Sequence, residues 1–287
     1  MCLLVLAWHA HPRYRLVVAA NRDEYHDRPA EGLGHWPAPA GMLAGRDLRA
    51  GGTWLGVDRH RRFGIVTNFR ELPQAAKSAS RAAPGTRCCA PGIVSGRAGE
   101  PDPPTRGSLI PGYLSQGAGA GEYLSSLEHE VAGYGGFNLL LADEALWYGS
   151  NRVSPFARRL PAGVHGLSNG PLDAPWPKLL RVRARFEAWL RENAHGQEAD
   201  SAALFALLDD RRPATEAEGA PMSELLPERE GALSAPFVQH PLYGTRCSTV
   251  VLIETSGVLR IAERRFDPDG RCAGQTEYRL RGAEWPD

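Results

Sequence analysis

The hydrophobic pattern of the first 25 residues predicts a β-hairpin. An apolar run, CLLVLAW at 2–8, is followed by the proline-containing turn HAHPRY at 9–14 and by a second run, RLVVAANRDEY, at 15–25. Two extended apolar runs around a short turn are typical of paired antiparallel strands. Because neither run alternates between apolar and polar residues, we expect other parts of the protein to cover both faces of this hairpin.

Further short apolar runs predict more strands along the whole chain. The predicted strands lie at 53–58, 62–69, 136–143, 145–151, 163–169, 248–254 and 257–266. The last two are joined by the residues TSG at 255–257, which suit a tight hairpin turn.

Three segments between these strands have helical spacing. Their apolar stripes contain Leu124, Leu127 and Val131 in 121–134; Trp176, Leu179, Leu180, Phe186, Trp189 and Leu190 in 176–193; and Leu204, Leu207 and Leu208 in 200–210. The helices fall between runs of strands without a regular strand–helix–strand alternation. This order predicts an α+β fold with antiparallel sheets.

One region interrupts the pattern. Residues 72–107 are rich in Pro, Gly, Ala, Ser and Arg and include PGTRCCAPG and EPDPPTRG. A segment so long and polar is unusual as a simple connection, so we expect a flexible insertion there. Without an internal repeat or a second core, the chain is predicted to form a single domain, 1–287.

Composition narrows the classes of function. Apolar residues make up 43% of the chain and charged residues 23%, as in ordinary globular proteins. The 33 basic and 33 acidic residues balance, which argues against a nucleic acid as a partner. Five cysteines without zinc-ligand spacing are typical of reduced thiols, and we find no apolar stretch of membrane-spanning length. We therefore expect a cytoplasmic protein that binds a small molecule.

The second residue has the most reactive chemistry. If Met1 is removed, Cys2 carries a thiol and a free α-amine on the same carbon. The amine has an ordinary pKa of about 7.7 to 8.0 and the thiol one of about 8.5, so the amine can act as the base for the thiol. Such a site also needs a cation or hydrogen-bond donors near the sulfur, and donors for the developing oxyanion. A lone cysteine here is more often a small buried apolar residue.

Polar residues at the ends of apolar strands are the candidates for these roles. Four consecutive polar residues, Asn21, Arg22, Asp23 and Glu24, end the second strand of the predicted hairpin. Strand alternation places Asn21 and Asp23 on one face and Arg22 on the other. Their alternative interpretation is a charged strand end.

Asn68, Asn169 and Arg246 occupy similar places at the border between an apolar strand and a loop. Each alone is interpreted as a turn residue or salt-bridge partner, but together they favour a shared cleft.

Other chemistries receive less support. The nine histidines form no HExxH motif, and there is no Cys-His zinc spacing or acidic calcium loop, so no metal site is predicted. The glycine-rich GAGAGE at 117–122 lacks the lysine of a phosphate-binding loop. Cys247 is interpreted as a core thiol rather than a second nucleophile.

Motifs spread over most of the chain resemble the NRDE family, also called the transport and Golgi organization 2 family. They include the initial MC, AANRDE at 19–24, AGRDLRAGGTWLG at 44–56, TNFRE at 67–71, GFNLLLAD at 136–143, YGSN at 148–151, GLSN at 166–169, PWPK at 175–178 and CSTVVL at 247–252. The resemblance implies an Ntn-hydrolase-like fold, a four-layer αββα sandwich of two antiparallel sheets. The segment at 72–102 is the main departure from the family pattern.

The same resemblance implies site roles similar to those of the choloylglycine and penicillin V acylases. Cys2 would be the nucleophile, and Asp23 would hold its amine and thiol. Asn68 and Asn169 would lie near the oxyanion, and Arg246 would be a supporting cation. The acylases' second arginine lies earlier relative to the aspartate, so Arg22 is an imperfect equivalent.

Three functions remain open at this point. The first is an N-terminal-cysteine amidohydrolase, acting on a small non-peptide amide or acyl compound without a cofactor. The second, implied by the resemblance alone, is a carrier or chaperone for haem or a lipid-like ligand that uses the same cleft without catalysis. The third is a structural or interaction protein that has lost its chemistry.

Overall fold

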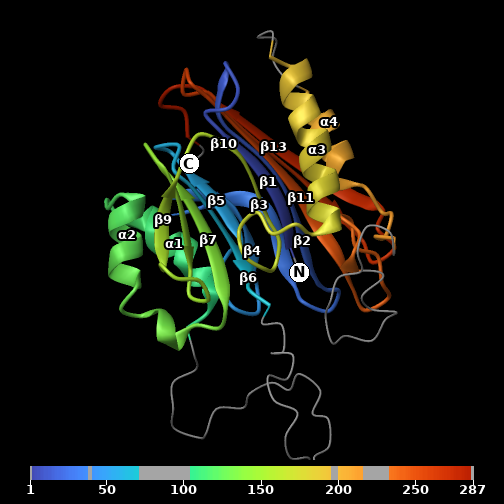
Figure 1. The fold of residues 1–287 in the computed structure, drawn as a ribbon, viewed down its shortest axis with the longest axis horizontal. Helices are drawn as coiled ribbons and strands as arrows, with labels where there is room; N and C mark the ends of the chain where they lie inside the picture. The colour runs from blue at the N-terminus through green and yellow to red at the C-terminus, as the bar shows by residue number, and fades with distance from the viewer. Residues whose placement is uncertain (1, 38–40, 71–103, 195–199, 216–232, 286–287) are drawn as a thin grey trace, which may run out of the picture.

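The computed structural model describes residues 2–37, 41–70, 104–194, 200–215 and 233–285. Two antiparallel sheets lie face to face, with helices on both outer sides (Figure 1). The six-stranded sheet has the order β10 (Gly163–Leu167), β1 (Cys2–Trp8), β2 (Tyr14–Tyr25), β11 (Tyr243–Glu254), β12 (Leu259–Phe266) and β13 (Cys272–Leu280).

The seven-stranded sheet follows the chain order. It consists of β3 (Ala30–Trp36), β4 (Met42–Asp47), β5 (Leu55–Asp58), β6 (Phe63–Asn68), β7 (Phe137–Ala142), β8 (Leu146–Ser150) and β9 (Ala157–Leu160). The helices are α1 (Leu109–Ser115), α2 (Ala120–Leu127), α3 (Pro177–Glu192) and α4 (Ser201–Leu208), with 3₁₀ turns η1 (Arg106–Ser108) and η2 (Val131–Gly133).

Three buried apolar clusters define the layers. One fills the space between the two sheets, the second joins the outer face of the six-stranded sheet to α3 and α4, and the third joins the outer face of the seven-stranded sheet to α1 and α2. Each buried Leu, Ile, Val or Phe contributes about 1.5 to 3 kcal/mol. The predicted four-layer αββα sandwich is confirmed.

The hairpin β1–β2 explains why its apolar runs do not alternate. Leu4 and Leu6 belong to the cluster between the sheets, whereas Leu3 and Val5 pack against the helices. Both faces of the strand are thus covered by apolar material, as the sequence predicts. The same alternation later decides where each polar residue of β2 points.

The strands predicted at 53–58, 62–69, 136–143, 145–151, 163–169, 248–254 and 257–266 all occur, with shifted ends. The helices at 176–193 and 200–210 occur as α3 and α4, but the segment 121–134 is divided into α2 and η2. Leu180, which the sequence pattern places on the apolar stripe of its helix, is 50% exposed and does not belong to the buried face of α3.

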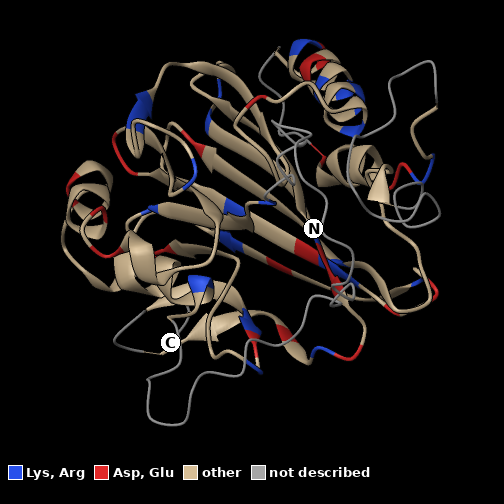
Figure 2. Cartoon of the chain, turned by 60° about the horizontal axis from the view of Figure 1, so that its bottom comes forward, with Lys and Arg blue, Asp and Glu red and all other residues tan. Residues whose placement is uncertain are grey.

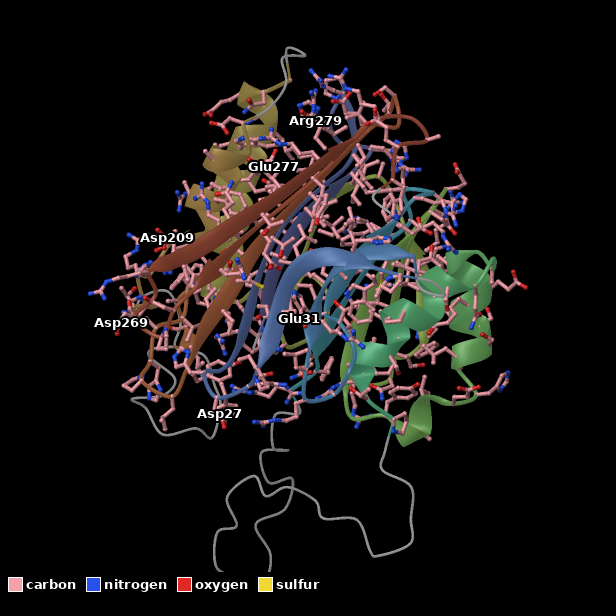
Figure 3. All side chains as sticks on the ribbon, turned by 180° about the vertical axis from the view of Figure 1, so that it is seen from behind. Asp27, Glu31, Asp209, Asp269, Glu277 and Arg279 are labelled. Carbon is pink, nitrogen blue, oxygen red and sulfur yellow. The ribbon has the colours of Figure 1, made fainter. Side chains whose placement is uncertain are left out.

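Strands β3, β4, β9 and β13 and helix α1 are not predicted by the sequence pattern. Strand β13 lies at the edge of the six-stranded sheet, and it carries exposed charged residues such as Glu277 and Arg279 (Figure 3). No residue of β13 is fully buried, and on its half-buried face only Tyr278 and Leu280 pack against the core between the sheets, so its sequence shows only a weak apolar pattern.

Of the region expected to be an insertion, 72–107, residues 72–103 lie outside the described residues. Its last residues, 104–107, are described, and they include the start of η1, where Thr105 caps the turn through the N–H of Gly107. In the described part of the chain, no helix has the length and apolar character needed to cross a membrane.

Candidate functional site

The backbone of Cys2 is held at both of its polar atoms. The antiparallel pairing of β1 with β10 brings the start of β1 next to the residues that follow β10. The Cys2 N–H donates to Oδ1 of Asn169 at 3.0 Å, and the Ser168 hydroxyl donates to the Cys2 carbonyl at 2.8 Å. The position of Cys2 is therefore fixed by segments more than 160 residues away.

Asn169 also connects the two sheets. Its Nδ2 donates to the carbonyl of Asn68 at 2.8 Å, and its own carbonyl accepts from the N–H of Arg70 at 2.7 Å. The Thr67 hydroxyl donates to the carbonyl of Ser168 at 3.0 Å. Through these bonds the end of β6 lies beside the start of β1, and Asn68 and Asn169 meet near Cys2.

Alternation along β2 separates its three predicted site residues. Asn21 and Asp23 face the helix layer, and Arg22 faces the space between the sheets. Asn21 donates to the carbonyls of Leu208 and Pro236 at 2.9 and 3.0 Å and accepts from the Ser248 hydroxyl at 2.6 Å. Its amide is fully used in joining β2 to its neighbours.

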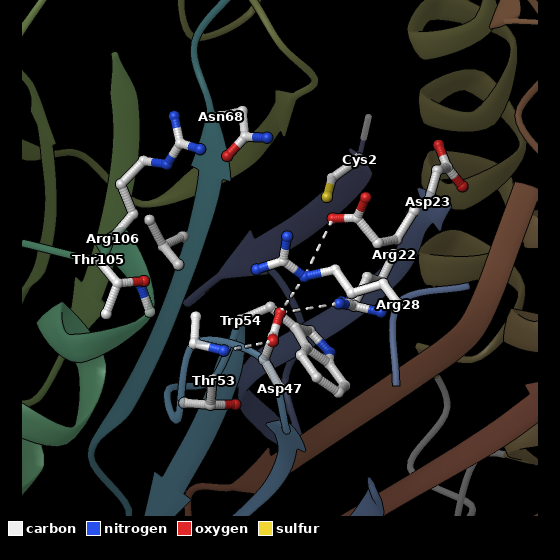
Figure 4. A pocket seen from close by; sticks show the side chains of 14 residues that line it. Cys2, Arg22, Asp23, Arg28, Asp47, Thr53, Trp54, Asn68, Thr105 and Arg106 are labelled. Atoms are coloured by element: carbon white, nitrogen blue, oxygen red, sulfur yellow. Dashed lines mark hydrogen bonds and ion pairs between the residues drawn. The ribbon is translucent and has the colours of Figure 1, made fainter. Parts of the chain in front are cut away.

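Asp23 is a buried carboxyl group directly behind Cys2. Its Oδ1 accepts a hydrogen bond of 2.6 Å from Thr245, whose hydroxyl oxygen in turn accepts from the N–H of Val238 at 2.9 Å. Burial raises the pKa of Asp23, and nearby cations and the Thr245 hydroxyl act in the opposite direction. In Figure 4 its side chain turns away from the cavity while Cys2 points its sulfur into it.

The sulfur faces a cavity of about 110 Å³ between the two sheets (Figure 4). Residues lining it are Cys2, Arg22, Asp23, Glu24, Arg28, Asp47, Ala50, Thr53, Trp54, Val66, Asn68, Thr105, Arg106 and Gly107. Of the predicted residues, Cys2, Arg22, Asp23 and Asn68 thus line this cavity, whereas Asn21, Asn169 and Arg246 do not.

Charged side chains dominate one wall. Arg28 forms an ion pair of 2.6 Å with Asp47, and Arg22 lies 3.4 Å from the same carboxylate while its guanidinium is 4.3 Å from the centre of the Trp54 ring. Burial acts to raise the pKa of Asp47, but Arg28 and the N–H of Ala50 outweigh it and hold that pKa below its usual range. The mixture of acidic and basic segments on strands near the N-terminus is visible in Figure 2.

Arg246 occupies a different place from the one expected of a supporting cation. It sits at a bulge in the pairing of β11 with β2. Its Nη1 donates to the carbonyls of Tyr25, His26 and Arg28 at 2.8, 3.1 and 3.2 Å. The guanidinium therefore holds the β2–β3 loop, whose residue Arg28 lines the cavity.

Two basic residues near the sulfur are missed by the sequence reasoning. Arg106 lines the cavity and donates to the carbonyl of Gly136 at 3.2 Å, but it lies in the segment interpreted as an insertion. Lys178 is 2% exposed, and its Nζ donates to the carbonyl of Leu233 at 3.0 Å. One clue was present in the sequence: of 33 basic residues only Lys77 and Lys178 are lysines.

The electrostatic state of the thiol follows from these surroundings. Burial raises the pKa of the Cys2 thiol, and the nearby N–H of Asp23 and the Arg22 charge act to lower it. Burial also lowers the pKa of Lys178 to about 8, although the charges of Asp23 and Cys2 oppose this.

Among the described residues, no group of three or more His, Cys, Asp or Glu side chains could hold a metal ion.

Comparison with known proteins points to one family. The sequence profile of the family described as Transport and Golgi organisation 2 matches residues 1–87 and 92–268. A Transport and Golgi organization protein 2 homolog of Bos taurus is 30% identical over 98% of this chain and all of its own length. The homolog of Mus musculus is 29% identical over 92% of both chains, and the Drosophila melanogaster protein is 23% identical over 94% of this chain and 95% of its own.

Proposed function

The chain belongs to the Transport and Golgi organisation 2 family, and we propose that it hydrolyses a small non-peptide amide or acyl compound with Cys2 as the N-terminal nucleophile. The observation that carries the proposal is the position of Cys2. Its sulfur lines a polar cavity while its backbone nitrogen donates to Asn169. Removal of Met1 would convert that nitrogen into the free amine that the chemistry needs.

In the proposed reaction, the Cys2 amine takes the thiol proton, and the sulfur attacks the carbonyl carbon of the substrate. A C–S bond forms, the C–N or C–O bond of the substrate breaks, and the leaving group takes the proton from the amine. Water then hydrolyses the thioester, which releases the acid and restores the thiol. The amide of Asn169 orients the amine throughout.

The negative charge that develops on the carbonyl oxygen of the substrate must be stabilised by hydrogen-bond donors that are already in place. The side chain of Asn68 lines the cavity on the wall that meets Cys2, and Arg106 lines it from the start of η1 (Figure 4). We assign Asn68 to the oxyanion and Arg106 to the polar part of the substrate beyond it.

A carrier for haem or a lipid-like ligand is the second candidate, and one observation favours it. A thiol whose pKa is raised by burial is a poor nucleophile and would suit binding without turnover. The cavity of about 110 Å³ favours the first candidate instead, because sites for drug-sized ligands usually enclose about 300 to 1,000 Å³. Haemin titration of the purified protein separates the two: a shifted Soret band that survives Cys2→Ala supports the carrier.

The hydrolase is tested by mass and by acylation. Intact-mass measurement first shows whether Met1 is removed, and retention in all molecules would exclude the self-activated mechanism. The protein is then mixed with p-nitrophenyl acetate, and peptide mass spectrometry locates the acetyl group. We expect a burst of p-nitrophenol and an acetylated Cys2. A burst without label on Cys2, or no burst at all, would contradict the proposal.

A further inference from the structure

We propose that Arg106 determines the specificity of the cavity and binds a carboxylate group of the compound that reacts at Cys2. This inference rests on the proposed function, because it names the class of substrate, but its test requires no turnover. The substrate would be a small amide or ester that carries a carboxylate only a few atoms away from the scissile carbonyl.

The charged side chains that line the cavity are unequally paired. Arg28 and Arg22 share the carboxylate of Asp47, at 2.6 and 3.4 Å, and Arg28 also lies 3.9 Å from Glu24. Arg106 lines the same cavity, but among the described residues no carboxylate lies within ion-pair distance of its guanidinium. In this part of the chain, Arg106 is therefore the cavity cation whose charge is left for a ligand.

The guanidinium of Arg106 also has hydrogen-bond donors left for a ligand. Its Nη1 donates to the carbonyl of Gly136 at 3.2 Å, while no described residue accepts from the edge formed by Nε and Nη2. A guanidinium binds a carboxylate through two parallel N–H···O bonds, so such an edge suits this planar anion. In the view of Figure 4, Arg106 lies on the wall opposite Cys2, and Asn68 lies between them.

Close backbone contacts hold Arg106 in place before any ligand arrives. The N–H of Thr53 donates to the carbonyl of Gly107 at 3.0 Å, and a Cβ on Gly52 would lie 2.3 Å from that carbonyl carbon. A Cβ on Gly135 would lie 3.0 Å from Nη1 of Arg106. Glycine allows these close approaches, and a side chain fixed in advance costs less to order on binding.

The volume of the cavity limits the size of the bound group. An engineered cavity of about 150 Å³ accepts benzene, so the cavity of about 110 Å³ has room for about four or five non-hydrogen atoms beyond the scissile carbonyl. Two carboxylate groups of this size are –NH–CH₂–COO⁻, on the amine side of an amide, and –CH₂–CH₂–COO⁻, on its acyl side.

The test compares the alkylation of Cys2 by iodoacetate and by iodoacetamide, followed on the Cys2 peptide by mass spectrometry. Both reagents meet the same fraction of thiolate at one pH, so the ratio of their rates reports how the site treats a carboxylate. The exposed Cys272 gives the reference ratio in the same chain. We expect the iodoacetate-to-iodoacetamide ratio to be about tenfold higher at Cys2 than at Cys272, and Arg106→Met to remove this difference.

Three further variants separate recognition by Arg106 from a general effect of charge. Arg106→Lys keeps the charge but loses the paired donors, so it should retain about a third of the ratio. Arg159→Met removes a charge from an exposed position on β9 and should leave the ratio within about twofold. Gly52→Ala keeps every charge but displaces Gly107, and it should lower the ratio. If Arg106→Met does not fold, the wild-type ratio and Arg106→Lys still decide the matter.

Protection of Cys2 against iodoacetamide shows which side of the carbonyl carries the carboxylate. N-acetylglycine has it on the amine side and succinamate on the acyl side, and N-acetylglycinamide and succinamide are their neutral counterparts. We expect one of the two acids to slow alkylation at concentrations where its neutral counterpart does not. Arg106→Met should remove that protection.

A ratio at Cys2 equal to that at Cys272, or one that Arg106→Met does not change, would overturn the inference, as would protection by neither acid. Alkylation requires no turnover, so the two proposals can fail separately. A ratio that depends on Arg106 in a protein that p-nitrophenyl acetate does not acylate would support carboxylate binding and contradict hydrolysis. An acylated Cys2 with a ratio independent of Arg106 would show the reverse.

Discussion

Cys2 and Cys247 lie in the same sheet on either side of the same arginine. In the strand pairing Cys2 is opposite Arg22 on β1, and Cys247 is opposite Arg22 on β11, so all three side chains share the face toward the other sheet. Burial raises the pKa of both thiols. Strand pairing and burial alone would therefore make the two thiols similar.

Their surroundings differ in what faces the sulfur. Cys247 is 4% exposed and lies near the buried carboxyl group of Glu263, which further disfavours its thiolate. Cys2 instead lines a cavity, and the N–H of Asp23 acts to stabilise its ionised form. The two cysteines show that access and nearby donors, rather than burial itself, separate a candidate nucleophile from a core thiol.

The largest effect should come from removing each sulfur in turn. We expect Cys2→Ala to lower the acylation burst with p-nitrophenyl acetate by at least about a thousandfold, since a nucleophile has no substitute. Cys247→Ala should leave the burst within about twofold and cost about 1 kcal/mol of stability by creating a small cavity. Burst kinetics and urea unfolding measure both, and equal losses of burst would remove the distinction.

The pH dependence of the free energy of unfolding should distinguish the surroundings of Cys2, through Lys178 at alkaline pH, from those of Cys247, through Glu263 at acidic pH. Lys178 has a pKa of about 8 in the folded protein and 10.5 as its ordinary value. Between these values the unfolded chain holds more protons, so the free energy of unfolding should rise with pH, by at most about 3 kcal/mol. Lys178→Met should lack this rise in urea titrations.

For Glu263 the sign is opposite. Burial raises its pKa above the ordinary 4.5, and the N–H of Leu33 opposes the shift. The folded state therefore keeps its proton longer, and its stabilising contribution is lost as pH rises from about 4.5 through the folded pKa. Glu263→Gln should remove this loss and keep the alkaline rise. Identical pH profiles for the two variants would contradict both predictions, because Lys178→Met should lose only the alkaline rise and Glu263→Gln only the loss of stability above about pH 4.5.

Two buried asparagines test whether acylation depends on how the backbone of Cys2 is positioned. Asn169→Leu removes the acceptor of the Cys2 N–H and should slow acylation about tenfold while costing about 2 kcal/mol of stability. Asn138→Leu is the matched control, because Asn138 bonds Thr67, Gly170 and Tyr148 instead. It should cost similar stability in thermal unfolding without changing the acylation rate per folded molecule.

Arg246→Met should have the smallest effect. The guanidinium holds three carbonyls of the β2–β3 loop, so its loss should cost about 1 kcal/mol and slow acylation no more than about threefold. Thermal unfolding and burst kinetics measure these values. A loss of acylation as large as that of Cys2→Ala would instead return Arg246 to the role of a supporting cation.

The layers of the fold could be predicted where both faces or one face of an element are buried. The hairpin at 2–25 is predicted from two continuous apolar runs around a short turn, and helices α3 and α4 from the spacing of their apolar residues. Strand β13 could not be found, because an exposed edge strand needs few apolar residues. Leu180 shows the opposite error, since an apolar residue on a helix surface is interpreted as buried when it is not.

For the site, alternation along β2 correctly separates Arg22 from Asn21 and Asp23. It could not tell that Asn21 uses its whole amide in packing, or that Arg106 lines the cavity from the segment interpreted as an insertion. Those outcomes depend on contacts between residues far apart in the chain.

The sequence by itself determined the strand and helix periods, the covered hairpin and the placement of a cysteine at its start, because these depend on neighbours within a few residues. Only the tertiary structure decided that Cys2 opens onto a cavity while Cys247 does not, that Asn169 accepts the hydrogen bond of the Cys2 N–H, and that Lys178 is buried. Access, desolvation and charge compensation arise from segments up to 176 residues away, brought together by sheet pairing and packing.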